Sequence, residues 1–96
     1  MRAGAKYKWA SVVTREWGPE HVQSAMSLIM AESGFNPFAI NPTSGAAGLF
    51  QALPASKMGC ELPNTDCQMR WGTSYIKNRY GTPTKAYSFW LQNRWY

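Results

Sequence analysis

Glycine and proline residues divide this chain into stretches of helix length, and their spacing constrains the fold more than any other feature. Glycine is favoured just past a helix end and proline at the first helical position, so these residues predict helix boundaries. No stretch shows the clean alternation of a strand of ordinary length. The sequence therefore predicts a mainly α-helical fold, with boundaries at Gly18-Pro19, Gly34, Gly81 and Pro83.

The apolar residues within these stretches recur every three or four positions, as on one face of a helix. They predict helices over residues 6–16, 19–33, 64–80 and 84–93, a helical turn at 53–59 and at most a small hairpin between 39 and 50. The residues expected on the buried faces are Tyr7, Ala10, Val13 and Trp17 in the first helix, Val22, Ala25, Met26, Ile29 and Met30 in the second, and Ala86, Phe89 and Trp90 in the last.

The composition limits the classes of protein to which the chain can belong. Its 96 residues are 45% hydrophobic and 15% aromatic, enough for one core, so we expect a single domain over residues 1–96. We also expect a monomer, although the composition gives no interface signature and leaves the oligomeric state open. The net charge of +5 favours an anionic partner such as a cell wall. Because the basic residues are scattered, we expect no nucleic-acid partner. No apolar run reaches transmembrane length, so we expect no membrane insertion.

The beginning of the chain shows no secretion signal, because residues 1–9 are polar and lack an apolar run. An exported protein with this beginning would be a secreted mature form, would belong to a longer chain, or would be delivered by a phage through lysis or with the virion.

The two cysteines, Cys60 and Cys67, are seven positions apart around Pro63 and Asn64. Such a pair closes a small ring in a protein that works outside the cytoplasm, so we expect a disulfide; the alternative is two reduced thiols in a cytosolic protein. The loop-entropy estimate for such a ring is about 2.5 kcal/mol. His21, the one histidine, has no cysteine or histidine partner at ligand spacing, so we expect no metal and no cofactor.

Glu32 is the acidic residue with the most apolar predicted surroundings. It falls in the last turn of the helix predicted over 19–33, on the same side as Ala25, Leu28 and Ile29. Partial burial and the negative end of the helix dipole both favour its protonated form. A carboxyl that keeps its proton near neutral pH can act as a general acid. The alternative is a solvated glutamate at a helix end.

The residues after Glu32 predict a loop that folds back toward this acid. Asn36-Pro37 and Asn41-Pro42 hold their asparagines extended, and Ser44-Gly45 predicts a turn. The side-chain amides of Asn41 and Gln51 can bond to sugar hydroxyl and acetamido groups. For Gln51 the alternative is a hydrogen bond that braces the loop.

The order of residues from 32 to 51 resembles the core motif of the soluble lytic transglycosylase (SLT) family, whose fold is akin to goose-type lysozyme. About a dozen positions match in order over twenty residues, so the match is specific. It implies a mainly α, lysozyme-like helical domain with at most a small β-hairpin beside the active-site cleft. The matching residues are Glu32-Ser33, Asn36-Pro37, Ala39, Asn41, Ser44-Gly45-Ala46 and Gly48-Leu49-Phe50-Gln51.

The C-terminal part resembles the same family. Tyr75-Ile76 and Arg79-Tyr80-Gly81 look like its helix before the third motif. Ala86-Tyr87-Ser88 stands where the family commonly has Ala-Tyr-Asn, and Ser88 keeps a polar group with a shorter reach. The ending from Phe89-Trp90 to Trp95-Tyr96 is similar to small actinobacterial and phage versions. The resemblance covers about residues 10–96.

The resemblance implies cleavage of the β-1,4 bond between N-acetylmuramic acid and N-acetylglucosamine, with peptidoglycan glycan strands as the partner. It also implies a protein that acts at the cell wall, either secreted or delivered by a phage. Glu32 would protonate the leaving oxygen and then take the proton of the sugar's own 6-hydroxyl, which gives a 1,6-anhydro product. A mechanism with one carboxyl suits the sequence because Glu16, Glu20, Glu61 and Asp66 are not obvious partners of Glu32. The residues expected to bind or orient the sugar are Ser33, Asn41, Gln51, Tyr75, Tyr87 and Ser88.

Other classes stay open at this point. A hydrolytic lysozyme or endolysin would use Glu32 with a water positioned by Glu61, Asp66 or polar loop groups, and would leave a reducing end. A non-catalytic wall-binding or virion structural module would keep the groove without cleavage. Phe35 and Phe50 either stack on sugar faces or pack in the core.

Overall fold

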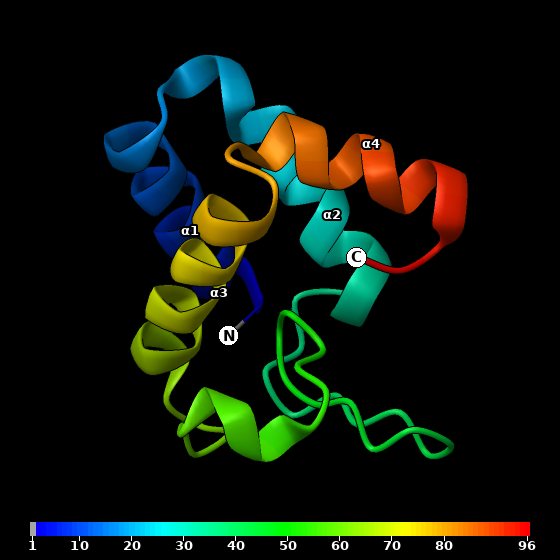
Figure 1. Ribbon diagram of the computed structural model, residues 1–96. Helices are drawn as coiled ribbons and strands as arrows, with labels where there is room; N and C mark the ends of the chain where they lie inside the picture. The colour runs from blue at the N-terminus through cyan, green and yellow to red at the C-terminus, as the bar shows by residue number, and fades with distance from the viewer. Residues whose placement is uncertain (1) are drawn as a thin grey trace.

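The computed structural model describes residues 2–96, which form four α-helices and two short 3₁₀ helices (Figure 1). Among these residues there is no strand, and isolated bridges pair Ala47 with Ile40 and with Ala52. The prediction of a mainly α fold with at most a small hairpin is confirmed. In chain order the elements are α1 (Arg2–Glu16), η1 (Pro19–His21), α2 (Val22–Ser33), η2 (Ala55–Met58), α3 (Thr65–Arg79) and α4 (Pro83–Asn93).

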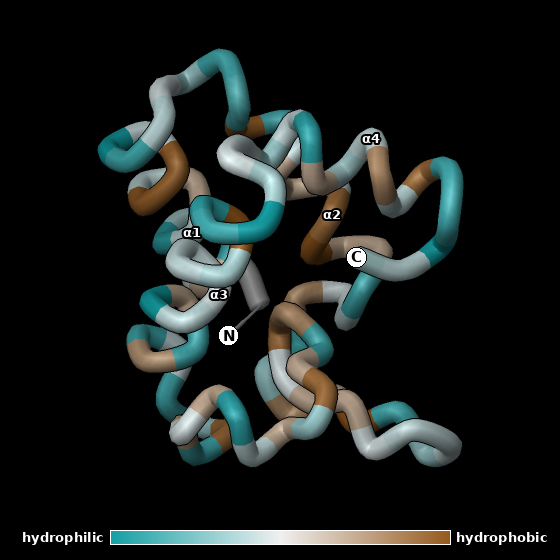
Figure 2. The backbone as a smooth tube through the Cα atoms, viewed as in Figure 1, coloured by the Kyte–Doolittle hydropathy of each residue, from teal (hydrophilic) through white to brown (hydrophobic). Residues whose placement is uncertain are grey.

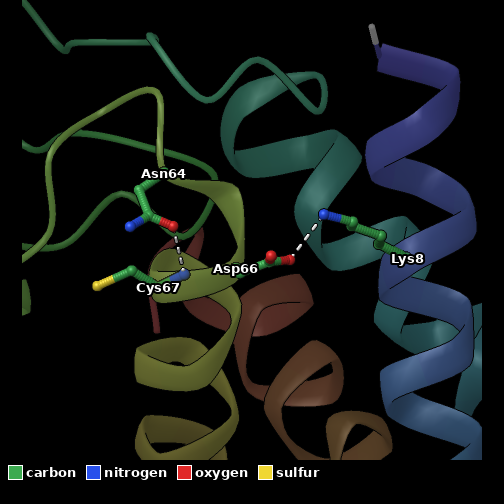
Figure 3. A network of polar contacts seen from close by, with 4 residues as sticks. All are labelled: Lys8, Asn64, Asp66 and Cys67. Atoms are coloured by element: carbon green, nitrogen blue, oxygen red, sulfur yellow. Dashed lines mark hydrogen bonds and ion pairs between the residues drawn. The ribbon is translucent and has the colours of Figure 1, made fainter.

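Local capping groups fix most helix ends where the sequence predicts them. Gly34 ends α2 in the left-handed conformation, with φ of 62° and its N–H donating to the Met30 carbonyl at 3.0 Å. Pro83 occupies the first turn of α4, as expected for a residue without an N–H. Asn64 Oδ1 accepts from the Cys67 N–H at 3.0 Å and so caps α3 (Figure 3).

Two helix starts differ from the prediction by more than one residue. α1 begins at Arg2 instead of residue 6, because its buried face continues back to Ala5. Pro19–His21 forms a 3₁₀ turn, with the His21 N–H donating to the Gly18 carbonyl at 3.2 Å, and α2 begins at Val22. The long second helix predicted over 19–33 is therefore a 3₁₀ turn followed by an α-helix.

The buried face of α1 also differs from the prediction. Trp9 and Val13 are fully buried, and the Trp9 indole N–H donates to the Ala25 carbonyl of α2 at 3.0 Å. Tyr7 is 80% exposed, so its predicted place in the core is wrong. Tyr7 and Val13 are six positions apart and lie on different faces of a helix, whereas Trp9 and Val13 are four apart. Met30, at 47% exposed, is likewise outside the core.

Helix α2 lies at the centre of the fold and packs against α1 and α4. Figure 1 shows α4 running across α2, α1 beside α3, and the loop over residues 34–54 beyond the C-terminal end of α2. Figure 2 shows a hydrophobic stretch on α2 beside its label. The largest fully buried side chains include Trp9, Leu28, Ile29, Phe50 and Ile76. This core holds the last turn of α2 against the loop that follows it.

Covalent and ionic contacts join the remaining elements. Cys60 and Cys67 form the predicted disulfide, which links the segment after η2 to the first turn of α3. The Lys8 ammonium lies 2.7 Å from the Asp66 carboxylate and joins α1 to α3 (Figure 3). Both groups of that ion pair are exposed, so the pair adds little stability. Within residues 2–96, no helix has the length and apolar character needed to cross a membrane.

Candidate active site

Glu32 lies in the last turn of α2 and lines a groove of about 600 Å³. The other walls of the groove come from the loop over residues 41–57, from α3, from α4 and from the segment after it. The predicted neighbours on the Glu32 side of α2, Ala25, Leu28 and Ile29, are fully buried. The carboxyl therefore stands where a buried helix face meets the groove.

Burial raises the pKa of Glu32 from 4.5 to about 7, and a hydrogen bond from Trp90 opposes this by lowering the pKa. Trp90 Nε1 on α4 donates to Glu32 Oε2 at 3.2 Å. At neutral pH such a carboxyl is divided between its protonated and ionised forms. It can donate a proton in one step and accept one in the next, which general acid–base catalysis requires.

The loop after α2 is held in place by side chains from the predicted motif. Ser33 Oγ donates to the Leu49 carbonyl at 2.9 Å and so ties the end of α2 to the loop. Gln51 Nε2 donates to the carbonyls of Ala39 and Gly48 at 3.1 and 2.9 Å, so this amide braces the loop, which was the alternative considered for Gln51. Gln51 also has a φ of 52°, a strained value for a residue with a side chain. These contacts hold the loop that forms part of the groove wall.

Asn41 also folds the loop with its side chain. Its Oδ1 accepts from the N–H groups of Thr43 and Ser44 at 2.9 and 3.1 Å, the geometry of an Asx-turn. Asn41 and Gln51 both line the groove beside Glu32. The structure therefore brings these two predicted sugar-binding amides together with the acid.

The end of the chain closes another wall of the groove. Tyr96 is buried, and its hydroxyl donates to the Phe50 carbonyl at 3.0 Å. The Tyr75 hydroxyl in turn donates to the Tyr96 carbonyl at 2.8 Å, and the two rings meet edge to face at 5.4 Å. Burial raises the pKa of Tyr96 well above its usual value, and the nearby charge of Glu32 raises it further by a smaller amount. Tyr75, one of the residues expected to bind or orient the sugar, is among the residues that line the groove.

Residues 17–91 match the sequence model of the family described as the transglycosylase SLT domain. The chain belongs to this family. The resemblance read from the motif around Glu32 is therefore confirmed. No curated protein and no solved structure gives a match. The matched range of this SLT domain contains both Glu32 and its hydrogen-bond donor Trp90.

The structure places other predicted site residues of the SLT domain away from the groove. Tyr87 is half-buried and reaches the site through its ring, which stacks on Trp90 at 6.2 Å. Ser88 is exposed, and neither it nor Tyr87 is among the described groove-lining residues. Phe35 and Phe50 are each 1% exposed, so their rings pack in the core. Phe50 borders the groove, but too little of its ring is exposed to stack on a sugar face.

The acids weighed as partners of Glu32 also lie elsewhere. Glu61 is exposed, and Asp66 pairs with Lys8, which lowers the pKa of Asp66. Asp66 borders a separate hollow of about 780 Å³ between α1 and α3. Glu32 is the one side-chain carboxylate among the described residues that line its groove. Residues 2–96 also contain no group of three or more histidines, cysteines or acids that could hold a metal ion.

Three residues that shape the site were not predicted to do so. Trp90 was expected to be an inward-facing core residue, and Tyr96 had no assigned role. Gln68 of α3 is fully buried: its Oε1 accepts from the Leu49 N–H at 2.8 Å, and its Nε2 donates to the carbonyls of Leu62 at 2.7 Å and of residue 37 at 3.2 Å. No local signal distinguishes such a glutamine from a surface one, because its partners lie in other segments.

Proposed function

We propose that this SLT domain is a lytic transglycosylase that cleaves the β-1,4 bond between N-acetylmuramic acid and N-acetylglucosamine in peptidoglycan. Membership of the family supports a transglycosylase-type enzyme that acts on the cell wall. The observation that carries the proposal is the single carboxyl, Glu32, which lines the groove with a pKa of about 7.

In the first step Glu32 donates its proton to the glycosidic oxygen while the bond from that oxygen to the anomeric carbon breaks. The acetamido oxygen of the muramic acid can stabilise the positive charge that develops. The ionised Glu32 then accepts the proton of the 6-hydroxyl as this oxygen attacks the anomeric carbon and closes the 1,6-anhydro ring. Glu32 ends the cycle protonated and no water is consumed, so the step needs no second carboxylate.

The neighbouring residues support this chemistry in different ways. The Trp90 indole favours the ionised form of Glu32, which is the form present between the two proton transfers. Ser33 and Gln51 hold the loop that forms part of the groove wall. Asn41 and Tyr75 present polar groups along the groove, where a glycan strand would lie. Tyr87 would act through Trp90, and Ser88 would contact only a strand that extends beyond the groove.

The test is mass spectrometry of the products released from purified peptidoglycan by the wild type and by Glu32→Gln. We expect an anhydro-muramyl product, one water lighter than the hydrolysis product, from the wild type and none from the variant. Glu61→Gln and Asp66→Asn serve as controls that should keep the anhydro product.

Other results would support a different class. A hydrated product that depends on Glu32 and on Glu61 or Asp66 would indicate a hydrolytic lysozyme. Absence of any product from the folded wild type would indicate a wall-binding or virion structural module.

A further inference from the structure

The groove beside Glu32 carries more positive charge than its single side-chain carboxyl can balance. Lys57, Arg79 and Arg94 line it, and Glu32 is the one acid among its described lining residues. The three cations come from separate parts of the chain, namely η2, the last turn of α3 and the C-terminal cap of α4. Three segments thus bring the same charge to one groove.

These three cations are not neutralised by carboxylates of the chain. The ion pairs found among residues 2–96 both lie elsewhere, between helices. The cations lie instead over aromatic rings: Lys57 Nζ is 5.2 Å and Arg79 Cζ 5.8 Å from the Tyr75 ring centre, and Arg94 Cζ is 5.0 Å from that of Trp90. A ring face holds a cation in position and leaves its N–H groups free to bind another acceptor.

The three cations do not act on the catalytic carboxyl either. An opposite charge within about 4–6 Å would lower the pKa of a carboxyl. The pKa of Glu32 is set by burial and by the Trp90 hydrogen bond, and it stays at about 7. Glu32 is therefore not the partner of these three cations.

We propose that Lys57, Arg79 and Arg94 form a carboxylate-binding site that makes this SLT domain selective for glycan strands bearing free carboxylates. The proposal rests on the proposed function, since it names the substrate class of the same groove. Guanidinium and ammonium groups bind carboxylates by charge-assisted hydrogen bonds. In peptidoglycan these carboxylates belong to the peptide stems, or to the lactyl groups of muramic acid where the stems are removed.

The test compares initial rates of cleavage on three preparations of the same peptidoglycan. One is untreated, one has its stem carboxylates converted to amides with carbodiimide and ammonia, and one has its stems removed by an amidase so that lactyl carboxylates are exposed. We expect the wild type to cleave the amidated strands about tenfold more slowly at low substrate concentration, through a higher KM at similar kcat. A fast rate on stripped strands identifies the lactyl group as the source, and a slow rate identifies the stem.

Variants then assign the selectivity to the groove. Arg79→Gln and Arg94→Gln should each reduce the preference for untreated over amidated strands about threefold to fivefold, as expected for one partly exposed charged contact. Lys85→Gln removes an exposed cation of α4 outside the groove and should keep the full preference. Equal loss of preference in Lys85→Gln would indicate a general effect of net charge and would overturn the proposal.

Failure of this proposal and failure of the proposed function give different results. If the wild type cleaves amidated and untreated strands at the same rate, the carboxylate site is refuted while Glu32-dependent cleavage stands. If nothing is cleaved, binding of soluble untreated and amidated strands to Glu32→Gln, measured by calorimetry, still decides the proposal. Tighter binding of the untreated strands supports it, and equal binding refutes it.

Discussion

The raised pKa of Glu32 makes a prediction about stability as well as about catalysis. Burial raises this pKa from 4.5 to about 7, so the folded state holds the proton more tightly than the unfolded state. The stability that the group contributes is fully present below pH 4.5 and is lost as the pH rises through about 7. Glu32→Gln keeps the size of the side chain and removes its titration, so the variant should gain stability relative to the wild type as the pH rises.

The structure gives the size of this gain. A shift from 4.5 to about 7 corresponds to at most about 3.4 kcal/mol, at about 1.36 kcal/mol per pKa unit. Glu32 remains partly exposed at the groove, and solvent screening at such a position reduces the effect by roughly half. Between about pH 4 and about pH 9, the unfolding free energy of the variant minus that of the wild type should therefore rise by about 1.5–2 kcal/mol.

Urea unfolding followed by circular dichroism at a series of pH values measures this difference, provided that the transition is two-state. Glu20→Gln is a suitable control, because Glu20 is an exposed glutamate on η1 and its replacement also removes one negative charge. A stability difference for Glu32→Gln that does not change with pH, or that falls as the pH rises, would refute the reasoning from burial.

Three further predictions follow from particular contacts. Trp90→Phe removes the hydrogen bond that lowers the pKa of Glu32. The alkaline limb of the pH profile of kcat/KM should therefore move to higher pH by roughly half to one unit. A limb that does not move would contradict the role of Glu32 as the general acid. Gly72→Ala puts a methyl group against the buried Phe50 ring, so it should lower the free energy of unfolding, measured by thermal unfolding, by about 1–3 kcal/mol. Gly4→Ala is the control, because its methyl group meets no atom within 4 Å and should not lower that free energy. Reduction of the disulfide should lower the free energy of unfolding by about 2.5 kcal/mol in urea, and no change on reduction would count against the ring-closure estimate.

The helix ends could be predicted because each depends on a few neighbouring residues. Gly34 ends α2 by adopting a left-handed conformation, and Pro83 fits the first turn of α4 because its missing N–H is not needed there. The buried face of α1 could not be predicted equally well. Sequence periodicity allowed a face through Tyr7, but only packing against α2 selects the face through Trp9.

The candidate site shows the same division. The burial of Glu32 follows from the apolar face of its own helix, so its raised pKa could be expected from sequence. Its hydrogen-bond donor Trp90 is 58 positions away, and Gln68 holds Leu49 across 19 positions. Neither partner has a sequence pattern of its own, because each contact exists only once α4 or α3 is packed in place.

The sequence by itself determined the helical composition, the cysteine pair and the apolar surroundings of Glu32 on its own helix, since each follows from residues close together in the chain. Only the tertiary structure decided what surrounds that acid. Packing of α4 against α2 places the Trp90 indole on Glu32. The convergence of η2, α3 and the end of α4 places Lys57, Arg79 and Arg94 along one groove. The physical reason is that hydrogen bonds and charges act over a few ångströms of space, whatever the separation of the residues in sequence.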